Sequence, residues 1–315
     1  MTFRILFLVV LICYWCKCAK QTWNLIAVDK TFDDQPFYEV SLMDERQCFG
    51  QCVYNKKCLS FEAYQTAPRK VECRLFDFTH STTLVEKVGA KLHSKVIYKN
   101  CLEYFRAGYI KNGVYKINLL GTLRDVYCFM EGEGGGWMAF QRRYDGSISF
   151  EDKGWVEYKD GFGDGSGEYW LGLEALHKLT SQQSYDLYVL AMDFTGRWES
   201  KRFAGFTIGP EEPEKYKFDY HSVYDGNQYS SLELFSNCKG MKFSTKLHDN
   251  DADARNCAIV YPGGWWYKVC HADLMNGKYS QTSVCDSPVA RGVHWEAFTG
   301  HGQCLKESLL MIRPN

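Results

Sequence analysis

The sequence predicts an α+β protein of two domains, a small disulfide-stapled domain followed by a larger one with a mainly antiparallel sheet. Three observations predict this organisation. A chain of 315 residues is long enough for about two domains. Four of its 14 cysteines lie within residues 48–73, as in small domains that disulfides hold together. Residues 101–315 alternate short strand-like runs with turn residues.

The overall composition is that of a globular protein, with 45% apolar and 24% charged residues. Lys and Arg number 37 and Asp and Glu number 38, so the net charge is −1. This balance argues against a nucleic-acid partner and against a polybasic membrane anchor. The sequence contains no G-x-S-x-G, H-E-x-x-H or phosphate-loop motif. We therefore expect that the protein is not an enzyme.

Residues 1–18 are typical of a secretory signal peptide. Arg4 is followed by the apolar run 5–15 and then by a cleavage site between Cys18 and Ala19. The alternative is an uncleaved anchor, but a membrane span takes about 20 apolar residues, more than this run supplies. We expect a secreted, extracellular protein without membrane insertion, in which disulfides persist.

The mature chain would keep an odd number of cysteines. Removal of Cys13, Cys16 and Cys18 with the signal peptide leaves one thiol free or paired between chains, unless Cys18 is retained and pairs with it. A zinc site is the alternative to disulfides, but it needs close cysteine pairs or histidines at metal spacing. Residues 48–73 contain no histidine, so disulfides are expected there.

Residues 19–98 form the expected small domain, with one helix and flanking strands. Ser41 is a suitable N-cap for the helix, in which Cys48 and Cys52 lie one turn apart and share a face. From that face the two cysteines can reach two different partners, Cys58 and Cys73. The expected strands are 23–28, 59–64 and 94–98.

Residues 101–315 form the second expected domain. Its strand-like runs are 137–143, 184–193 and 203–208, and the segment 168–180 has helical spacing. A domain of this length buries a large core without further cross-links.

Three carboxylates alternate along a short segment of this domain, at Asp249, Asp251 and Asp253. Ca²⁺ takes about six to eight oxygen ligands from carboxylates, carbonyls and water, and a tight loop turns Asp249 and Asp251 towards one point. An EF-hand is excluded, because Ala254 and Val260 stand where such a loop needs Gly and Glu. The alternative is a solvated acidic turn, since Asp and Asn favour turns.

An aromatic segment follows, bounded by Cys257 and Cys270. It contains Tyr261 and the run 263–267 (GGWWY), and His271 comes directly after it. Aromatic walls with one hydrogen-bonding group suit a small acetyl-type ligand. The alternative is that these rings fill the core and that the histidine is structural.

A cysteine pattern marks the small domain, Cys48-x3-Cys52-x5-Cys58-Leu-Ser-Phe followed by Cys73-Arg-Leu-Phe. On this pattern the domain resembles the PAN/apple domain, a helix on an antiparallel sheet. The resemblance implies the disulfides Cys48–Cys73 and Cys52–Cys58. Domains of this kind bind proteins or carbohydrates.

Ordered motifs run through the large domain, among them 113–117 (GVYKI), 134–143 (GGGWMAFQRR), 155–163 (WVEYKDGFG), 168–173 (EYWLGL), 243–251 (FSTKLHDND) and 263–267 (GGWWY). On these motifs residues 101–315 resemble the C-terminal globular domain that fibrinogen chains share with ficolins, tachylectin-5-like lectins, tenascins and angiopoietins. The resemblance implies a mainly antiparallel sheet and a loop-rich subdomain for ligand and calcium. It also implies the disulfides Cys101–Cys128 and Cys257–Cys270.

The same resemblance implies Ca²⁺ as a cofactor. Its ligands would be the carboxylates of Asp249 and Asp251 and the backbone carbonyls of Asp253 and Arg255. One departure is Leu247, which stands where the family often has another Asp and so removes a nearby negative charge.

The resemblance also implies a ligand pocket. In the acetyl-binding lectins of the family, this pocket uses residues that match Tyr261, His271 and the peptide Val269–Cys270. The other wall departs from their pattern, because His301 stands where these lectins have Trp.

The segment 280–291 of that wall is longer than usual and contains an additional cysteine, Cys285. Cys304 is also an addition, and we expect a disulfide Cys285–Cys304 across the pocket rim. Cys238 is then left without a partner and becomes the candidate for a bridge between chains in a homo-oligomer.

We expect a secreted, calcium-dependent recognition protein, a lectin that binds acetylated carbohydrates in innate recognition. Tyr261 and His271 favour this hypothesis. The alternative is an extracellular protein–protein ligand or matrix component, in which the calcium loop is structural and the same surface contacts a protein receptor. The altered far wall of the pocket favours that alternative. A third hypothesis, a toxin-type protein that acts on haemostasis, is not separated from the second by the sequence.

Overall fold

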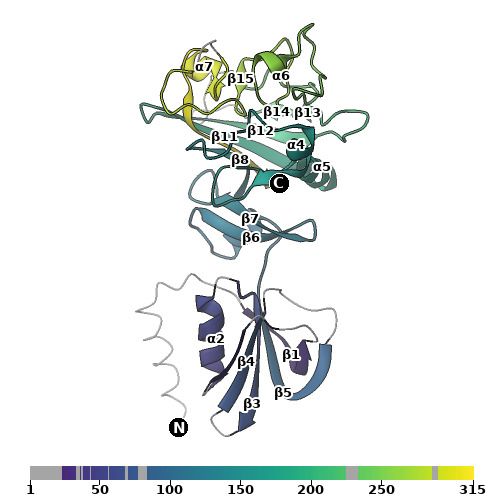
Figure 1. The fold of residues 1–315 in the computed structure, drawn as a ribbon, viewed down its shortest axis with the longest axis vertical. Helices are drawn as coiled ribbons and strands as arrows, with labels where there is room; N and C mark the ends of the chain where they lie inside the picture. Colours follow the sequence, from purple (N-terminus) through teal and green to yellow (C-terminus); the bar gives the residue numbers. More distant parts are fainter. Residues whose placement is uncertain are drawn as a thin grey trace. The chain divides into compact units, whose positions relative to one another are not determined.

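The computed structural model divides into two compact units, residues 1–97 and 98–315 (Figure 1). The expected signal peptide, residues 1–18, lies outside the described residues. No helix in the described part of the chain is long and apolar enough to cross a bilayer. The described residues are 23–32, 36, 38–42, 44–55, 57–67, 70–76, 84–224, 233–285 and 290–315.

The first unit is a five-stranded antiparallel sheet with one helix, the architecture that the sequence predicts. Its strand order is β1-β5-β3-β4-β2, and every neighbouring pair runs antiparallel. The elements are β1 (Trp23–Phe32), β2 (Tyr38–Leu42), α2 (Glu45–Tyr54), β3 (Ser60–Ala67), β4 (Lys70–Phe76) and β5 (Leu84–Lys95).

The helix of this unit begins later than the sequence predicts. Ser41 belongs to β2, where it pairs with Glu72, so it does not cap the helix. Asp44 is the N-cap instead, and its carboxylate accepts a hydrogen bond from the Gln47 N–H at 3.1 Å. The expected strand 94–98 is also displaced, because β5 pairs with β1 and β3 and ends at residue 95.

Four buried cysteines form the centre of the first unit, in contact with Phe61 and other apolar residues. Cys52 and Cys58 are joined by a disulfide, as predicted. The predicted bridge between Cys48 and Cys73 is not formed, and both are buried thiols. The hydrogen bond between the two thiols raises the pKa of Cys73, and burial raises it further.

The second unit is built on a ten-stranded sheet whose paired strands all run antiparallel. The main order is β13-β12-β11-β17-β8-β10-β9, with β14 on β12 and the β6–β7 hairpin on β8. The C-terminal strand β17 lies between β11 and β8. The strands are β6 (Gly113–Leu119), β7 (Thr122–Phe129), β8 (Trp137–Arg143), β9 (Phe162–Gly163), β10 (Tyr169–Trp170), β11 (Tyr185–Asp193), β12 (Trp198–Ile208), β13 (Phe218–Asp219), β14 (Ser222–Val223) and β17 (Leu305–Pro314).

The helices α3 (Cys101–Arg106), α4 (Trp155–Asp160) and α5 (Leu173–Gln182) accompany this sheet. The predicted helix 168–180 therefore begins later than expected. Its first residues form β10, which pairs with β8 and β9. Gly172 then takes a φ of 111°, a conformation that favours glycine, and turns the chain into α5.

The described residues between β14 and β17, 233–285 and 290–304, have little regular structure and gather on one side of the sheet (Figure 1). The aromatic run 265–267 is fully buried and fills the core, as the alternative hypothesis for these rings required. The short elements among these residues are α6 (Cys257–Val260), β15 (Asp273–Leu274), β16 (His294–Trp295) and α7 (Glu296–Thr299).

Candidate calcium loop and ligand pocket

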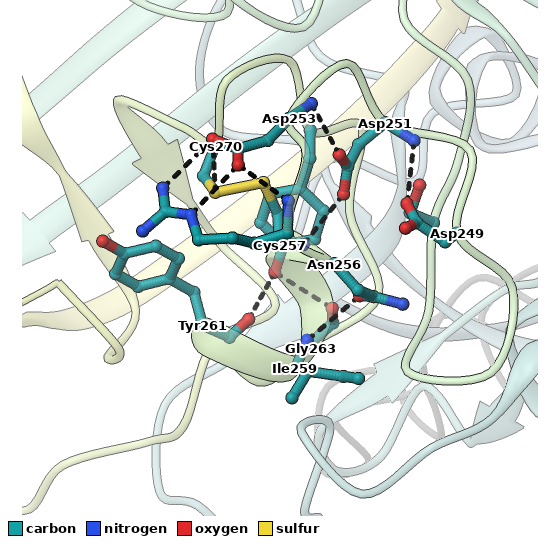
Figure 2. The surroundings of a disulfide bond; sticks show 12 residues. Asp249, Asp251, Asp253, Asn256, Cys257, Ile259, Tyr261, Gly263 and Cys270 are labelled. Carbon is teal, nitrogen blue, oxygen red and sulfur yellow. Dashed lines mark hydrogen bonds and ion pairs between the residues drawn. A yellow bond between two sulfur atoms is a disulfide. The ribbon is translucent and has the colours of Figure 1, made fainter.

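The aspartate loop is a succession of local turns beside a disulfide (Figure 2). Each carboxylate accepts a hydrogen bond from the backbone N–H two residues later: Asp249 from Asp251 at 3.3 Å, Asp251 from Asp253 at 2.9 Å and Asp253 from Arg255 at 2.9 Å. The second oxygen of Asp251 accepts from the Cys257 N–H at 2.9 Å. The central carboxylate therefore joins the loop to the start of α6.

The three carboxylates lie in different electrostatic environments. Burial raises the pKa of Asp251, and the adjacent Asp249 carboxylate raises it further. Arg255 pairs with Asp253 through Nε and Nη2, each 3.0 Å from a carboxylate oxygen, and lowers the pKa of Asp253 to about 2. The Asp253 side chain is thus neutralised by an arginine, whereas Asp249 and Asp251 repel each other.

The donor groups of this loop fit Ca²⁺. A cation would relieve the repulsion between Asp249 and Asp251. Beside them lie the carbonyl oxygens of Asp253 and Arg255, which accept no hydrogen bond from the residues that the structure describes. The result is an all-oxygen set of the kind that Ca²⁺ prefers. These are the four groups that the sequence singles out, and the calcium assignment itself stays a prediction.

A disulfide fastens this loop to the segment that carries the pocket. Cys257, at the start of α6, is bonded to Cys270. The Ala252 N–H donates to the Lys268 carbonyl at 2.9 Å, which adds a second link between the same two segments. Asn256 caps α6 by accepting from the Ile259 N–H at 3.1 Å. The loop and the pocket segment are therefore held as one body.

Three of the predicted pocket residues lie together. Tyr261 meets His271 edge-to-face, with ring centroids 4.6 Å apart. His294 lies 5.0 Å from His271 and 5.9 Å from His301, again between ring centroids. The sequence analysis missed His294, because one histidine before a tryptophan carries no local signal of function.

The two other predicted pocket residues, Val269 and Cys270, differ in exposure. Val269 is 69% exposed and Cys270 5%, and the peptide that joins them is trans. The cis peptide among the described residues is Glu212–Pro213.

His271 carries an unusual hydrogen-bonding state. Both of its ring nitrogens are buried and have no hydrogen-bond partner among the described residues. Burial, with smaller effects from His294 and His301, lowers the pKa of His271 to about 2. Burial also lowers the pKa of His294 to about 4. Both rings are neutral at physiological pH, with nitrogen lone pairs that a ligand could use.

The cysteines of the second unit form three of the predicted disulfides, Cys101–Cys128, Cys257–Cys270 and Cys285–Cys304. Cys238 is an unpaired thiol with 2% of its surface exposed. The predicted bridge between chains through Cys238 is therefore wrong for the folded unit, because a second chain cannot reach a buried sulfur.

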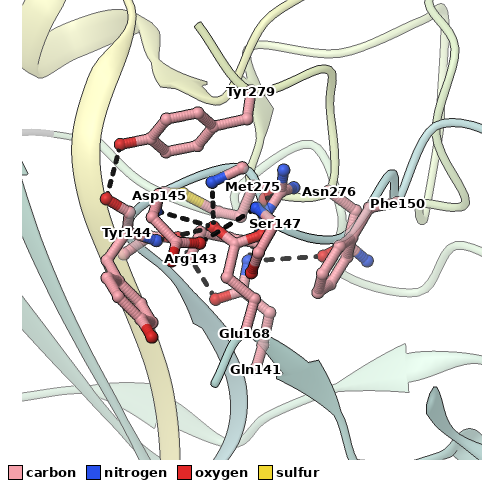
Figure 3. Close-up of polar contacts among 12 residues, drawn as sticks. Gln141, Arg143, Tyr144, Asp145, Ser147, Phe150, Glu168, Met275, Asn276 and Tyr279 are labelled. Atoms are coloured by element: carbon pink, nitrogen blue, oxygen red, sulfur yellow. Dashed lines mark hydrogen bonds and ion pairs between the residues drawn. The ribbon is translucent and has the colours of Figure 1, made fainter. Parts of the chain in front are cut away.

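A buried ion pair joins the sheet to the loops (Figure 3). Arg143, at the end of β8, and Glu168 are both fully buried, and Nε lies 3.3 Å from Oε2. Glu168 also accepts hydrogen bonds from the N–H groups of residues 144–146, at 2.7, 3.1 and 3.0 Å. Arg143 donates to the Gly277 carbonyl at 2.9 Å. Sequence patterns gave no sign of this pair, because its partners converge only in the folded unit.

Comparisons with known proteins cover the second unit. The family profile described as "Fibrinogen beta and gamma chains, C-terminal globular domain" matches residues 97–315. Fibrinogen C domain-containing protein 1 of Homo sapiens is 40% identical over 219 residues, which are 68% of this chain and 46% of that protein. Angiopoietin-1 of Canis lupus familiaris is 36% identical over 255 residues, 78% of this chain and 50% of that protein. The chain spans about half the length of these relatives.

Solved structures show the same relationship. The fibrinogen-like globe domain of human ANGPTL6 has a TM-score of 0.66 at 34% identity, over 70% of this chain and 96% of that one. The corresponding domain of human ANGPTL2 has a TM-score of 0.64 at 35% identity, over 69% and 99%. These relatives do not support the ficolin-type lectin subgroup that the sequence analysis expected.

Proposed function

Since the profile match and these relatives cover the whole second unit, the chain belongs to the family of fibrinogen C-terminal globular domains, and we propose that it is an extracellular ligand that binds a protein receptor. The predicted signal peptide and the disulfides support secretion. The similarity to angiopoietin-1 supports the choice of a protein partner.

The observation that carries the proposal is a set of exposed apolar side chains around the aspartate loop. Leu247 is 87% exposed, Ile259 59% and Val269 69%. Two hydrogen bonds hold their segments together: Asn256 Nδ2 donates to the Lys246 carbonyl at 3.2 Å, and the Ala252 N–H donates to the Lys268 carbonyl. Large apolar groups exposed on a folded, cross-linked surface are typical of protein contacts.

Binding of the labelled full chain to cells of the source organism tests the proposal. We expect saturable binding that proteinase K treatment of the cells abolishes. The triple variant Leu247→Ser/Ile259→Ser/Val269→Ser should weaken binding by at least about 10-fold, because it removes the apolar centre of the contact. The matched control is Ile110→Ser, which removes a residue 62% exposed that precedes β6, and it should bind like the wild type. Binding that survives protease treatment, or that the triple variant leaves unchanged, contradicts the proposal.

Calcium is proposed to stabilise this surface rather than to contact the receptor. Asp249, Asp251 and the carbonyls of Asp253 and Arg255 would hold the ion, whose charge neutralises the two carboxylates and fixes the loop. Removal of the ion would leave the carboxylates of Asp249 and Asp251 in repulsion.

Chelation should therefore lower the thermal unfolding midpoint of the full chain. At a Ca²⁺ concentration about 100 times Kd, binding stabilises by about 2.7 kcal/mol, so a fall of about 5–10 °C is expected on adding EGTA. Differential scanning calorimetry with and without EGTA measures this. In the Asp251→Asn variant, the unfolding midpoint should no longer change when EGTA is added. Asp164→Asn is the control, because Asp164 makes the same kind of turn with the Ser166 N–H outside the loop. Equal midpoints with and without chelator count against the calcium site.

A lectin that binds acetylated glycans is the second candidate, supported by the contact of Tyr261 with the unpartnered His271. The cell-binding experiment separates the two candidates. A lectin would be displaced by soluble acetate or N-acetylglucosamine and would survive protease treatment of the cells, whereas the protein ligand would not respond to either sugar or acetate.

The first unit is proposed to be a PAN/apple-like module that binds proteins. Support comes from its helix on an antiparallel sheet, from the Cys52–Cys58 disulfide, and from the adjacent thiols of Cys48 and Cys73. Because Cys238 is buried, a homo-oligomer would form through non-covalent contacts rather than through a Cys238 bridge.

A further inference from the structure

Three histidines from separate segments line up beside Tyr261. His271 follows the Cys257–Cys270 disulfide, His294 is in β16, and His301 follows α7. The row runs from His271 through the fully buried His294 to His301, whose side chain is 44% exposed. The aspartate loop uses oxygen atoms, whereas this cluster offers only imidazole nitrogens and one carboxylate, that of Glu296.

We propose that His271, His294 and His301 bind a divalent transition-metal ion of the zinc class. This inference does not rest on the proposed receptor binding and concerns a site distinct from the calcium loop. Neutral imidazole suits Zn²⁺, Cu²⁺ and Ni²⁺, whereas Ca²⁺ takes oxygen ligands.

The hydrogen bonds of the rings leave the right nitrogens free. His294 Nδ1 lies 2.9 Å from the Gly292 carbonyl, so it carries the proton and donates it there. This fixes the tautomer and leaves the lone pair on Nε2, which is buried and has no partner among the described residues. Metal-bound histidines usually donate their other N–H to a backbone carbonyl or carboxylate in this way. His271 adds two further buried nitrogens without a described partner.

The spacing of the rings suits a shared ion. Two imidazoles bound to one tetrahedral zinc at about 2.0–2.1 Å have ring centroids about 5 Å apart. The pair His271–His294 has a separation of 5.0 Å, and the pair His294–His301 has 5.9 Å. Nitrogens from all three rings do not yet lie within 4.8 Å of one another, so binding requires a rotation of His301 towards the other two.

His301 is free to make that rotation. Its side chain is exposed, and its polar contact is with Glu296, whose Oε1 lies 2.7 Å from Nε2. That contact leaves Nδ1 available, and Glu296 would either orient the ring or supply a fourth ligand. The backbone of His301 is fixed, because its carbonyl accepts from the Ala290 N–H at 3.1 Å.

The additional disulfide holds this rim in place. Cys285 and Cys304 join the segments on either side of His294 and His301, and the Cys285 N–H donates to the Gly302 carbonyl at 3.2 Å. Gly292 packs against the sulfurs so closely that an added Cβ would lie 2.1 Å from the Cys304 Sγ. The carbonyl of the same Gly292 accepts the hydrogen bond from the His294 Nδ1–H, so the cross-link supports the histidine's orientation.

Isothermal titration of Zn²⁺ into the full chain, without a histidine tag and with Ca²⁺ in excess, tests the proposal. We expect one zinc ion per chain. His271→Gln and His301→Gln should each weaken binding by at least about 10-fold, and the double variant should abolish it. His301→Gln changes an exposed side chain, so it preserves the fold. His177→Gln is the matched control, because His177 is a partly buried histidine whose Nδ1 contacts the Ile208 carbonyl outside the cluster, and it should bind zinc like the wild type.

Co²⁺ provides a second readout that does not depend on heat. Tetrahedral coordination by the histidines should give visible absorption that Zn²⁺ abolishes. The absence of zinc binding overturns the proposal, as does binding that persists in the double variant. Zinc binding that excess Ca²⁺ displaces also overturns it, because the ion would then occupy the aspartate loop.

Discussion

Glu168→Gln and Arg143→Met should each lower the free energy of unfolding of the second unit by about 3–5 kcal/mol, because each leaves a buried charge without its partner. Both side chains are fully buried, so water cannot replace the lost contact. Glu168 also binds the three N–H groups of residues 144–146, and Arg143 reaches the Gly277 carbonyl. Either change therefore loosens the attachment of the loops to the sheet.

Denaturant unfolding followed by tryptophan fluorescence measures this effect. Arg142→Met is the matched control, since Arg142 is the neighbouring arginine but has no buried carboxylate partner among the described residues. It lies over the Tyr127 and Tyr144 rings, 4.1 and 4.5 Å from their centroids, and donates a hydrogen bond to the Gly165 carbonyl at 3.4 Å. Its loss should destabilise by about 1 kcal/mol or less. If Arg142→Met and Arg143→Met lower the free energy of unfolding equally, the buried ion pair contributes no more stability than the neighbouring arginine does, which contradicts the prediction.

Removal of the disulfide in the double variant Cys257→Ala/Cys270→Ala should destabilise the second unit by about 3 kcal/mol, the value expected for a closed loop of this length. The same double variant should also bind calcium more weakly. The Cys257 N–H binds Asp251, and the bridge keeps the aspartate loop against the segment that ends in His271. Without it the loop must be ordered at the moment of calcium binding, which weakens the affinity.

Calorimetric unfolding and calcium titration of the same sample check both parts of this prediction. Cys238→Ala is the control, because it removes a buried cysteine without opening a loop and should leave calcium affinity unchanged. If the double variant unfolds and binds calcium like the wild type, then neither the stability nor the loop geometry depends on the bridge.

Several features of this protein depend only on residue type and on close neighbours, and these can be predicted from the sequence. The alternation of Asp249, Asp251 and Asp253 produces local turns from each carboxylate to the N–H two residues on, and such turns need no distant contact. The Cys52–Cys58 bridge is local for the same reason. The family of the second unit also followed from ordered motifs, which the profile match over residues 97–315 bears out.

Other features depend on residues far apart in the chain and follow only from the packing of the folded unit. Tyr169 and Trp170 join a strand rather than the predicted helix because β8 offers them hydrogen-bond partners. Cys238 is buried in the core of the second unit, which removes its predicted role between chains. His294 becomes a candidate metal ligand only because folding places its ring between those of His271 and His301. Local turns follow from short-range hydrogen bonds, whereas burial and the convergence of side chains are set by packing of the whole unit, which no single segment encodes.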